Sequence, residues 1–225
     1  MKKIKINNRV FGNIFEPSAP KKLQFLLIHG WQGRQNLKLA QVLCDQGFRC
    51  LTFEMRGHGE SKGNISKLTS NDFLGDVLAA YNVLQKKKLP IGVIGSSFGA
   101  YLAVLLSAKR SVVCLSLRVP ANYPNESFVK PKIMAWGVKA WRKKSLTLSD
   151  NMALQALHQF TGNVQLIEAE NDEIVPHQTI ANYLTVVNAK KLEYHCMKSA
   201  PHSLTNQKLN KEYQALVITW AKKQF

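Results

Sequence analysis

The chain has 225 residues, 45% of them hydrophobic, which is enough to bury a sizeable core and excludes a chain that is disordered by composition. Its 31 Lys and Arg residues against 14 Asp and Glu residues give a formal net charge of +17. Such a field attracts anions of many kinds, including nucleic acid, anionic lipid and phosphorylated substrates. The basic residues are scattered along the sequence and no nucleic-acid-binding module is recognisable, so no specific nucleic-acid partner is expected.

The cysteines and the hydropathy of the chain bear on its compartment. The four cysteines form no Cys-x-x-Cys pair and indicate neither a disulfide framework nor a zinc site. The first residues, Met1 to Lys5, carry positive charge without an apolar run behind them. No stretch of about 18 apolar residues predicts a membrane-spanning helix. We therefore expect a soluble, cytoplasmic protein without a bound metal.

Short apolar runs typical of β-strands alternate with longer helical patterns, which favours an α/β fold with a mainly parallel sheet. An antiparallel hairpin is expected around an Asn-Asn turn, and several later runs are apolar at nearly every position, as in strands buried on both faces. The predicted strands are residues 3–7, 10–15, 23–28, 50–53, 91–94, 112–117, 164–169 and 192–197.

Two helices are predicted with particular boundaries. Thr69 and Asp72 have capping-box spacing, and an apolar face follows until Pro90. The last helix covers roughly residues 203–222.

One stretch, residues 120–149, has no strand pattern and is interpreted as a lid inserted into a single domain that spans residues 1–225. Pro131 is expected to start a helix within this lid. Its residues Lys132, Lys139 and Lys143 would share one basic face.

The pentapeptide Gly95-Ser96-Ser97-Phe98-Gly99 follows the predicted strand 91–94 and precedes an apolar helical run. Strand, sharp turn and helix in this order are typical of a nucleophile elbow, which lifts the central serine above the edge of the sheet. We predict Ser97 as the nucleophile. Gly95 and Gly99 leave room where strand and helix close up. The rival Ser96 would point back along the strand.

A serine hydroxyl needs a base, and in this fold the chain order is serine, acid, histidine. His202 is the predicted base, because it lies just past the last predicted strand, where a loop opens the final helix. His195 lies within that strand and is interpreted as structural. His177, at a helix start, is the less suitable alternative.

The acid that orients the base is expected at the carboxyl end of the preceding strand, residues 164–169. Asp172 is the predicted acid. Glu170 would still belong to the strand, and Glu173 is the closest rival. Asp150 precedes the strand and is disfavoured.

Acyl transfer also requires N–H groups that stabilise an oxyanion. The backbone N–H groups of Trp31 and Phe98 are predicted to form this oxyanion hole, because the loop 29–33 follows a strand in the correct chain order before the elbow. His58 is interpreted as a loop-organising residue.

Aromatic residues near the elbow and in the lid suggest an apolar acyl pocket. The predicted lining residues are Trp31, Tyr123 and Trp136.

These motifs, in this order, resemble the α/β-hydrolase superfamily over roughly residues 23–205. The loop Gly57-His58-Gly59-Glu60-Ser61 is similar to that of small esterases, monoacylglycerol lipases and serine aminopeptidases. The sequence after the predicted strand 112–117 is similar to bacterial carboxylesterases with short lids. The resemblance implies a sheet of about eight strands, a Ser97, His202 and Asp172 triad, a covalent acyl-enzyme and no cofactor.

The first functional hypothesis is therefore hydrolysis of a small-molecule carboxylic ester or thioester. An aminopeptidase-like serine peptidase is the alternative, although it would need an acid for the substrate amine, and Glu126 is the one acid between residue 120 and Asp150. A third hypothesis is a non-catalytic basic binding protein. The basic lid also suggests contact with an anionic membrane surface or an anionic substrate.

Overall fold

A computed structural model describes residues 1–134 and 137–224. The strands are β1 Lys2–Lys5, β2 Phe11–Phe15, β3 Gln24–Ile28, β4 Arg49–Glu54, β5 Ile91–Ser96, β6 Cys114–Arg118, β7 Asn163–Asn171 and β8 Leu192–Pro201. The α-helices are α1 Leu37–Asp45, α2 Ser70–Gln85, α3 Phe98–Ser107, α4 Val138–Trp141, α5 Met152–His158, α6 His177–Leu184 and α7 Gln207–Lys222. Short 3-10 helices lie at Asn125–Val129, Lys132–Met134, Leu148–Asp150 and Ala189–Lys191.

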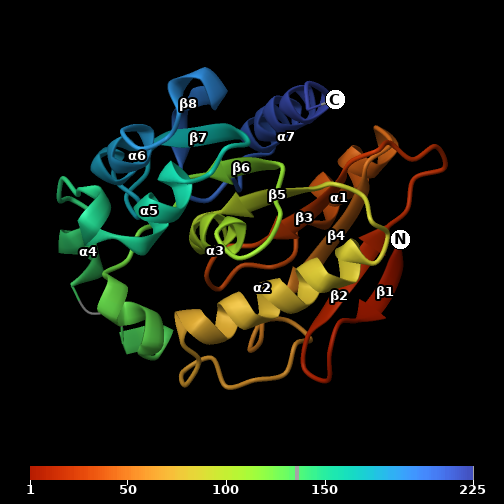
Figure 1. Cartoon of the computed structure of the whole chain (residues 1–225), viewed down its shortest axis with the longest axis horizontal. Coiled ribbons are helices and arrows are strands. Elements are labelled where there is room, and N and C mark those ends of the chain that lie inside the picture. The colour runs from red at the N-terminus through yellow and green to blue at the C-terminus, as the bar shows by residue number, and fades with distance from the viewer. Residues whose placement is uncertain (135–136, 225) are drawn as a thin grey trace.

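The eight strands form one sheet in the order β1-β2-β4-β3-β5-β6-β7-β8 (Figure 1). β1 and β2 form the expected antiparallel hairpin, β2 pairs antiparallel with β4, and the strands from β4 to β8 are parallel. The predicted mainly parallel α/β sheet is confirmed. Because parallel strands point the same way, the loops after β3, β5, β7 and β8 emerge at one edge, where open α/β sheets hold their ligands.

Helices cover both faces of the sheet, and each face has its own hydrophobic core. α2, α3 and α5 pack on one face over residues such as Leu26 and Val93; α2 and α3 lie on the near side of the sheet in Figure 1. α1 and α7 pack on the other face over Leu27 and Ile94. Adjacent residues of a strand point to opposite faces, so Leu26 and Leu27 belong to different cores.

Polar side chains set the first residues of α2 and α7. The Thr69 hydroxyl accepts from the Asp72 N–H at 3.1 Å while the Asp72 carboxylate accepts from the Thr69 N–H at 2.9 Å, which confirms the capping box at the start of α2. The last helix begins at Gln207 and not at 203, because the Asn206 side chain accepts two N–H groups of the first turn.

The segment 120–149 forms short helical turns in its described part, and an isolated bridge joins Pro131 to Thr69. The single basic helix predicted from Pro131 was wrong. Gly137 has φ of 73°, in the left-handed region, and directly precedes α4, so an α-helix cannot continue through it. Lys132 and Lys139 therefore do not share one helix face.

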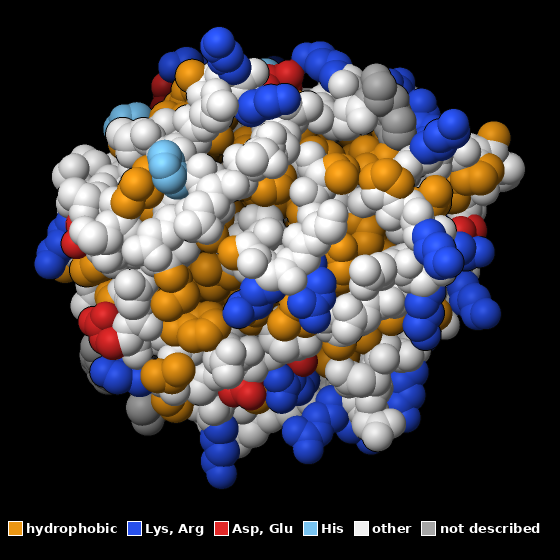
Figure 2. Space-filling model, viewed as in Figure 1, with side chains coloured by type: hydrophobic (Ala, Val, Ile, Leu, Met, Phe, Trp, Pro, Cys, Tyr) orange, Lys and Arg blue, Asp and Glu red, His pale blue; other side chains and the backbone are white. Residues whose placement is uncertain are grey.

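Lys and Arg side chains are spread over the face seen in Figure 2, with few acidic side chains between them. Some acidic side chains form ion pairs within the fold; for example, the carboxylate of buried Asp76 lies 2.6 Å from Arg56 Nε. Within residues 1–134 and 137–224, no helix combines the length and the apolar character that crossing a membrane requires.

A buried histidine fixes the loop that follows β3. His29 Nε2 accepts the Met55 N–H at 3.1 Å, so the ring proton is on Nδ1, which donates to the Gly30 carbonyl at 2.7 Å. The pKa of His29 is lowered from 6.5 to about 4, mainly by burial; the hydrogen bond to Gly30 opposes this shift and the nearby His58 adds to it. The neutral ring thus ties the end of β3 to the end of β4.

We expect the free energy of unfolding to fall as the pH drops from about 6.5 to 4. The unfolded chain binds a proton at His29 in this range and the folded chain does not, which costs on the order of 3 kcal/mol by the end of the range. Urea unfolding at a series of pH values measures the slope. His29→Gln should remove this part of the slope, and His158→Gln, at an exposed histidine, is the control. Equal slopes in wild type and His29→Gln would contradict the assignment.

Candidate active site

The turn between β5 and α3 holds Ser97 in a strained backbone conformation. Its φ of 55° and ψ of −117° lie outside the regions that non-glycine residues favour. The Ser97 N–H donates to the Arg118 carbonyl at 2.9 Å, and the Ser97 carbonyl accepts from the Ala100, Tyr101 and Ala121 N–H groups. These bonds hold the strain in place, which is typical of a functional turn.

The two glycines of the turn allow close approaches of the backbone. A Cβ atom at Gly95 would lie 2.6 Å from the Ala100 Cα, on the helix that follows. A Cβ at Gly99 would lie 2.4 Å from the carbonyl oxygens of Ile28 and His29. Gly95 thus leaves room between strand and helix as predicted, whereas Gly99 leaves room for the end of β3.

The two serines of the turn have different surroundings. Ser96 Oγ accepts from Arg118 Nε at 3.0 Å. Ser97 is 8% exposed, and the described residues provide no hydrogen bond to its Oγ. The sequence had placed Ser96 back along the strand, and its hydrogen bond to β6 agrees with that placement.

Asp172 and His202, the predicted acid and base, lie together at the sheet edge. Asp172 Oδ2 is 2.7 Å from His202 Nδ1. Its Oδ1 accepts from the N–H groups of Ile174 and Val175 at 2.8 and 2.7 Å. The Asp172 side chain is 2% exposed and that of His202 is 20% exposed. A carboxylate held in this way accepts the Nδ1 proton and leaves Nε2 unprotonated and able to act as a base.

The rival acids have other partners or none near His202. Glu170 pairs with Lys198 at 2.8 Å and accepts the Ser199 N–H. Asp150 caps a 3-10 helix through the Thr147 N–H, and Glu173 is exposed.

The rival histidines also lie elsewhere. His177 contacts Glu168 at 2.8 Å, and His195, within β8, contacts Glu193 at 2.9 Å.

Arg118, the last residue of β6, connects the base to the elbow. Its Nη1 donates to the His202 carbonyl at 2.9 Å, and its Nε donates to Ser96 Oγ. A single guanidinium therefore holds the residue before Ser97 beside His202. This role of Arg118 was not predicted, although a charged residue directly after the predicted strand 112–117 was a signal available in the sequence.

The backbone N–H groups predicted for the oxyanion hole are free. Neither the Trp31 N–H nor the Phe98 N–H has a hydrogen-bond partner among the described residues. The loop that carries Trp31 passes close to the elbow, since a Cβ at Gly30 would lie 4.0 Å from Ser97 Oγ.

His58 holds this same loop. Its Nε2 accepts the Gln32 N–H at 3.1 Å, so its Nδ1 donates to the Arg56 carbonyl. Gln32 has a φ of 54°, and its N–H follows Trp31 directly. The loop-organising role predicted for His58 is confirmed.

The predicted pocket residues Trp31 and Tyr123 meet around a lysine. The Lys132 ammonium lies 4.2 Å from the ring centroid of Tyr123, 4.8 Å from Trp31 and 5.1 Å from Phe98. Three rings around one ammonium form a cation–π site. This contact was not predicted from the sequence, in which Lys132 was assigned to one basic face of a lid helix. Trp136, the third predicted pocket residue, lies outside the described residues.

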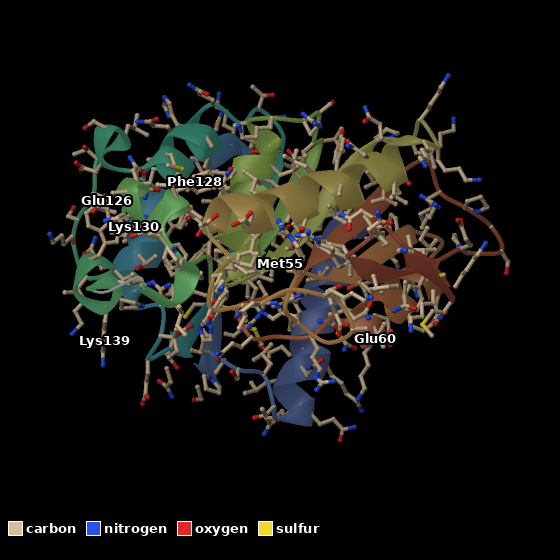
Figure 3. The ribbon with its side chains drawn as sticks, turned by 90° about the horizontal axis from the view of Figure 1, so that it is seen from below. Met55, Glu60, Glu126, Phe128, Lys130 and Lys139 are labelled. Atoms are coloured by element: carbon tan, nitrogen blue, oxygen red, sulfur yellow. The ribbon has the colours of Figure 1, made fainter. Side chains whose placement is uncertain are left out.

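A second cation lies against the same cluster. The Arg142 guanidinium is 4.9 Å from the Tyr123 ring centroid, is 8% exposed, and donates to the Ile174 carbonyl at 2.9 Å. Glu126 is exposed, and Figure 3 shows it with Phe128 and Lys130 in the segment between β6 and α5. The surroundings of Tyr123 are therefore cationic.

Among the described residues, no three His, Cys, Asp or Glu side chains gather as a possible metal site.

Comparison with known proteins identifies the family and other structures with the same fold. A model of the Alpha/beta hydrolase family matches residues 25–190. Curated protein sequences give no match. Among solved structures, Est1E from Butyrivibrio proteoclasticus, with ferulic acid bound, is 16% identical with a TM-score of 0.76, covering 100% of this chain and 99% of that one.

Two further structures show the same fold. The monoacylglycerol lipase of Paleococcus ferrophilus is 16% identical with a TM-score of 0.75, covering 96% of this chain and 99% of that one. An alpha-beta serine hydrolase homologue from Coxiella burnetii is 19% identical with a TM-score of 0.69, covering 93% and 90%. Since the family model covers most of the sequence, the chain belongs to the alpha/beta hydrolase family.

Proposed function

We propose that this protein is a serine hydrolase that cleaves carboxylic ester or thioester bonds of small molecules through an acyl-enzyme. The observation that carries the proposal is the Asp172–His202 pair, held beside the elbow by Arg118. The esterase and lipase of similar fold support hydrolysis in general. The proposal that the cleaved bond is an ester or thioester, and not a peptide bond, is based on the residues around Ser97.

In the first step, His202 Nε2 takes the Ser97 Oγ proton while Oγ attacks the substrate carbonyl carbon. The bond from Oγ to Nε2 often tightens only when substrate binds. Asp172 keeps the ring oriented and stabilises the imidazolium. The carbonyl oxygen becomes an oxyanion, and the free Trp31 and Phe98 N–H groups are the donors that would hold it.

The tetrahedral intermediate then collapses. The bond to the leaving group breaks, and the alkoxide or thiolate takes the proton from His202, which leaves the acyl group on Ser97. Water gives a proton to His202 and attacks the acyl carbon. Ser97 leaves as the alcohol after recovering that proton, and the carboxylic acid is released.

The aromatic cluster suggests where the acyl group binds. Trp31 and Tyr123 face the elbow residue Phe98, and Lys132 reaches them from the segment 120–149. We propose that this segment is a lid of a single domain, and that an acyl chain displaces the Lys132 side chain. Cations at this place oppose binding of a substrate amine, which disfavours an aminopeptidase.

Ser97→Ala should lower kcat for nitrophenyl esters by roughly 10⁴-fold or more, because the nucleophile is lost. Ser96→Ala is the matched control and should lose no more than about tenfold. The assay compares esters of graded acyl length with amino-acid anilides. Ester turnover that persists in Ser97→Ala would refute the assignment, and a preference for anilides would favour a peptidase.

Asp172→Asn should lower kcat by about 10⁴-fold, because the amide no longer holds the His202 ring in the tautomer that leaves Nε2 as the base. Glu170→Gln, at the neighbouring strand end, should leave kcat within about twofold, since Glu170 contacts Lys198 and not His202. Steady-state kinetics of both variants measures the difference. Equal losses in the two variants would show that Asp172 is not the acid.

Lys132→Ala should raise kcat/KM for long neutral acyl esters relative to short ones by about tenfold. A cation–π contact of about 1–2 kcal/mol no longer has to be broken for the longer chain to enter. Lys130→Ala removes an exposed lysine of the same segment and is the control. An unchanged chain-length ratio in Lys132→Ala would place the acyl group elsewhere.

A further inference from the structure

A cavity of about 720 Å³ lies on the face of the sheet covered by α1 and α7. Its walls come from the ends of β3, β5 and β6, the start of α1 and the loop before α7. It borders the candidate catalytic residues, since Gly30, Ser96 and Ser203 line it. The cluster around Lys132 contributes no residue to these walls, so this is a separate place in the molecule.

The cavity is cationic. Arg34, Lys38 and Arg118 line it, and its lining within the described residues includes no Asp or Glu. Arg34 and Lys38 are exposed, whereas Arg118 is 9% exposed. No described carboxylate forms an ion pair with Arg118. Asp172 acts on it from further away but is bonded to His202 and two N–H groups.

Two donors at the cavity wall have no hydrogen-bond partner among the described residues, and both atoms are open to solvent. Arg118 uses Nε and Nη1, but its Nη2 has no hydrogen-bond partner among the described residues. The Tyr213 ring lies 5.7 Å from the Arg118 guanidinium carbon, and its hydroxyl likewise has no partner there although Tyr213 is 4% exposed. Burial raises the pKa of Tyr213 to about 12, so this hydroxyl keeps its proton and can donate. Both donors are therefore available to an acceptor that enters the cavity between them.

The first turn of α1 faces the same space. Asn36, Leu37 and Lys38 line the cavity, and the Lys38 N–H has no partner among the described residues. No acidic side chain lies in this turn. The amino end of a helix carries partial positive charge and favours an anion.

We propose that this cavity binds a small organic anion through a carboxylate or phosphate group placed between Arg118, Tyr213 and the start of α1. Arg34 and Lys38 add long-range attraction at its mouth. The volume suits a small molecule, and Leu37 and Leu204 offer apolar contact for the rest of it. The site goes beyond the proposed hydrolysis, and it touches that site through Arg118, which bonds Ser96 and His202.

The test measures binding of inorganic phosphate to the full chain carrying Ser97→Ala, by calorimetry at ionic strength matched with chloride. Turnover plays no part in this readout, so its result is independent of the proposed hydrolysis. Two variants probe the site: the double substitution Arg34→Ala with Lys38→Ala, and Tyr213→Phe. The control is Lys62→Ala with Lys67→Ala, which removes the same charge from two exposed lysines that are not part of the cavity wall.

We expect phosphate to bind the parent and the control double variant alike. Affinity should fall about tenfold in the Arg34 and Lys38 double variant, because two cations at the mouth of the cavity are lost. It should fall about threefold to fivefold in Tyr213→Phe, because one hydrogen bond to the anion is lost. The proposal is overturned if phosphate does not bind the parent. Equal losses in the control double variant would also overturn it, since they would show a general effect of surface charge.

A second arm identifies where the anion comes from. Wild-type protein is assayed with a nitrophenyl ester whose acyl chain ends in a carboxylate and with the methyl-capped ester of the same length. If the anion is part of the substrate, the Arg34 and Lys38 double variant loses about tenfold in kcat/KM for the first ester only. An equal response to both esters, with phosphate binding as expected, makes the anion a separate ligand.

Discussion

The backbone at Ser97 is the constraint on which the site depends. Its positive φ is held because the N–H and carbonyl of Ser97 are both bonded, to β6 and to α3. The close approach of Gly99 to the end of β3 then brings the loop of Trp31 to the same place. One turn therefore sets the position of Ser97, the proposed nucleophile, relative to the Trp31 and Phe98 N–H groups that are proposed to hold the oxyanion. A shift of any of the three neighbouring elements would move these groups together.

Positively charged side chains lie on both sides of the sheet edge that carries the candidate site. On the side of α2 and α3, Lys132 and Arg142 lie against the rings of the aromatic cluster. On the side of α1 and α7, Arg118 lines a cavity without acidic residues among its described lining. The net charge of +17 is thus not only a surface property. It places cations beside the candidate site, and under the proposed function these cations would favour anionic or strongly polarised substrates over amines.

The sequence predicted the features that depend on local order along the chain. Residues near one another in the sequence determine the strand runs, the capping box of Thr69 and the turn around Ser97. The pairing of Asp172 with His202 was predicted from the order of the strands, because the loops that carry the two residues meet at one edge of the sheet. Arg118 and Lys132 could not be assigned in this way, because their partners lie on other strands and loops. Gly137 was a local sign that no helix continues from Pro131, but the helical spacing of the apolar and basic residues around it still predicted one.

The partners of the two buried guanidinium groups have a consequence for acid conditions. Arg118 and Arg142 are bonded to carbonyl oxygens, a hydroxyl and aromatic rings, none of which gains a proton as the pH falls. An arginine held by carboxylates would lose its partners when these became neutral. The links from β6 to the His202 loop and from the segment 120–149 to the Asp172 loop should therefore persist in acid. They would still connect the loops of the candidate site at a pH where protonation of His29 has lowered the free energy of unfolding.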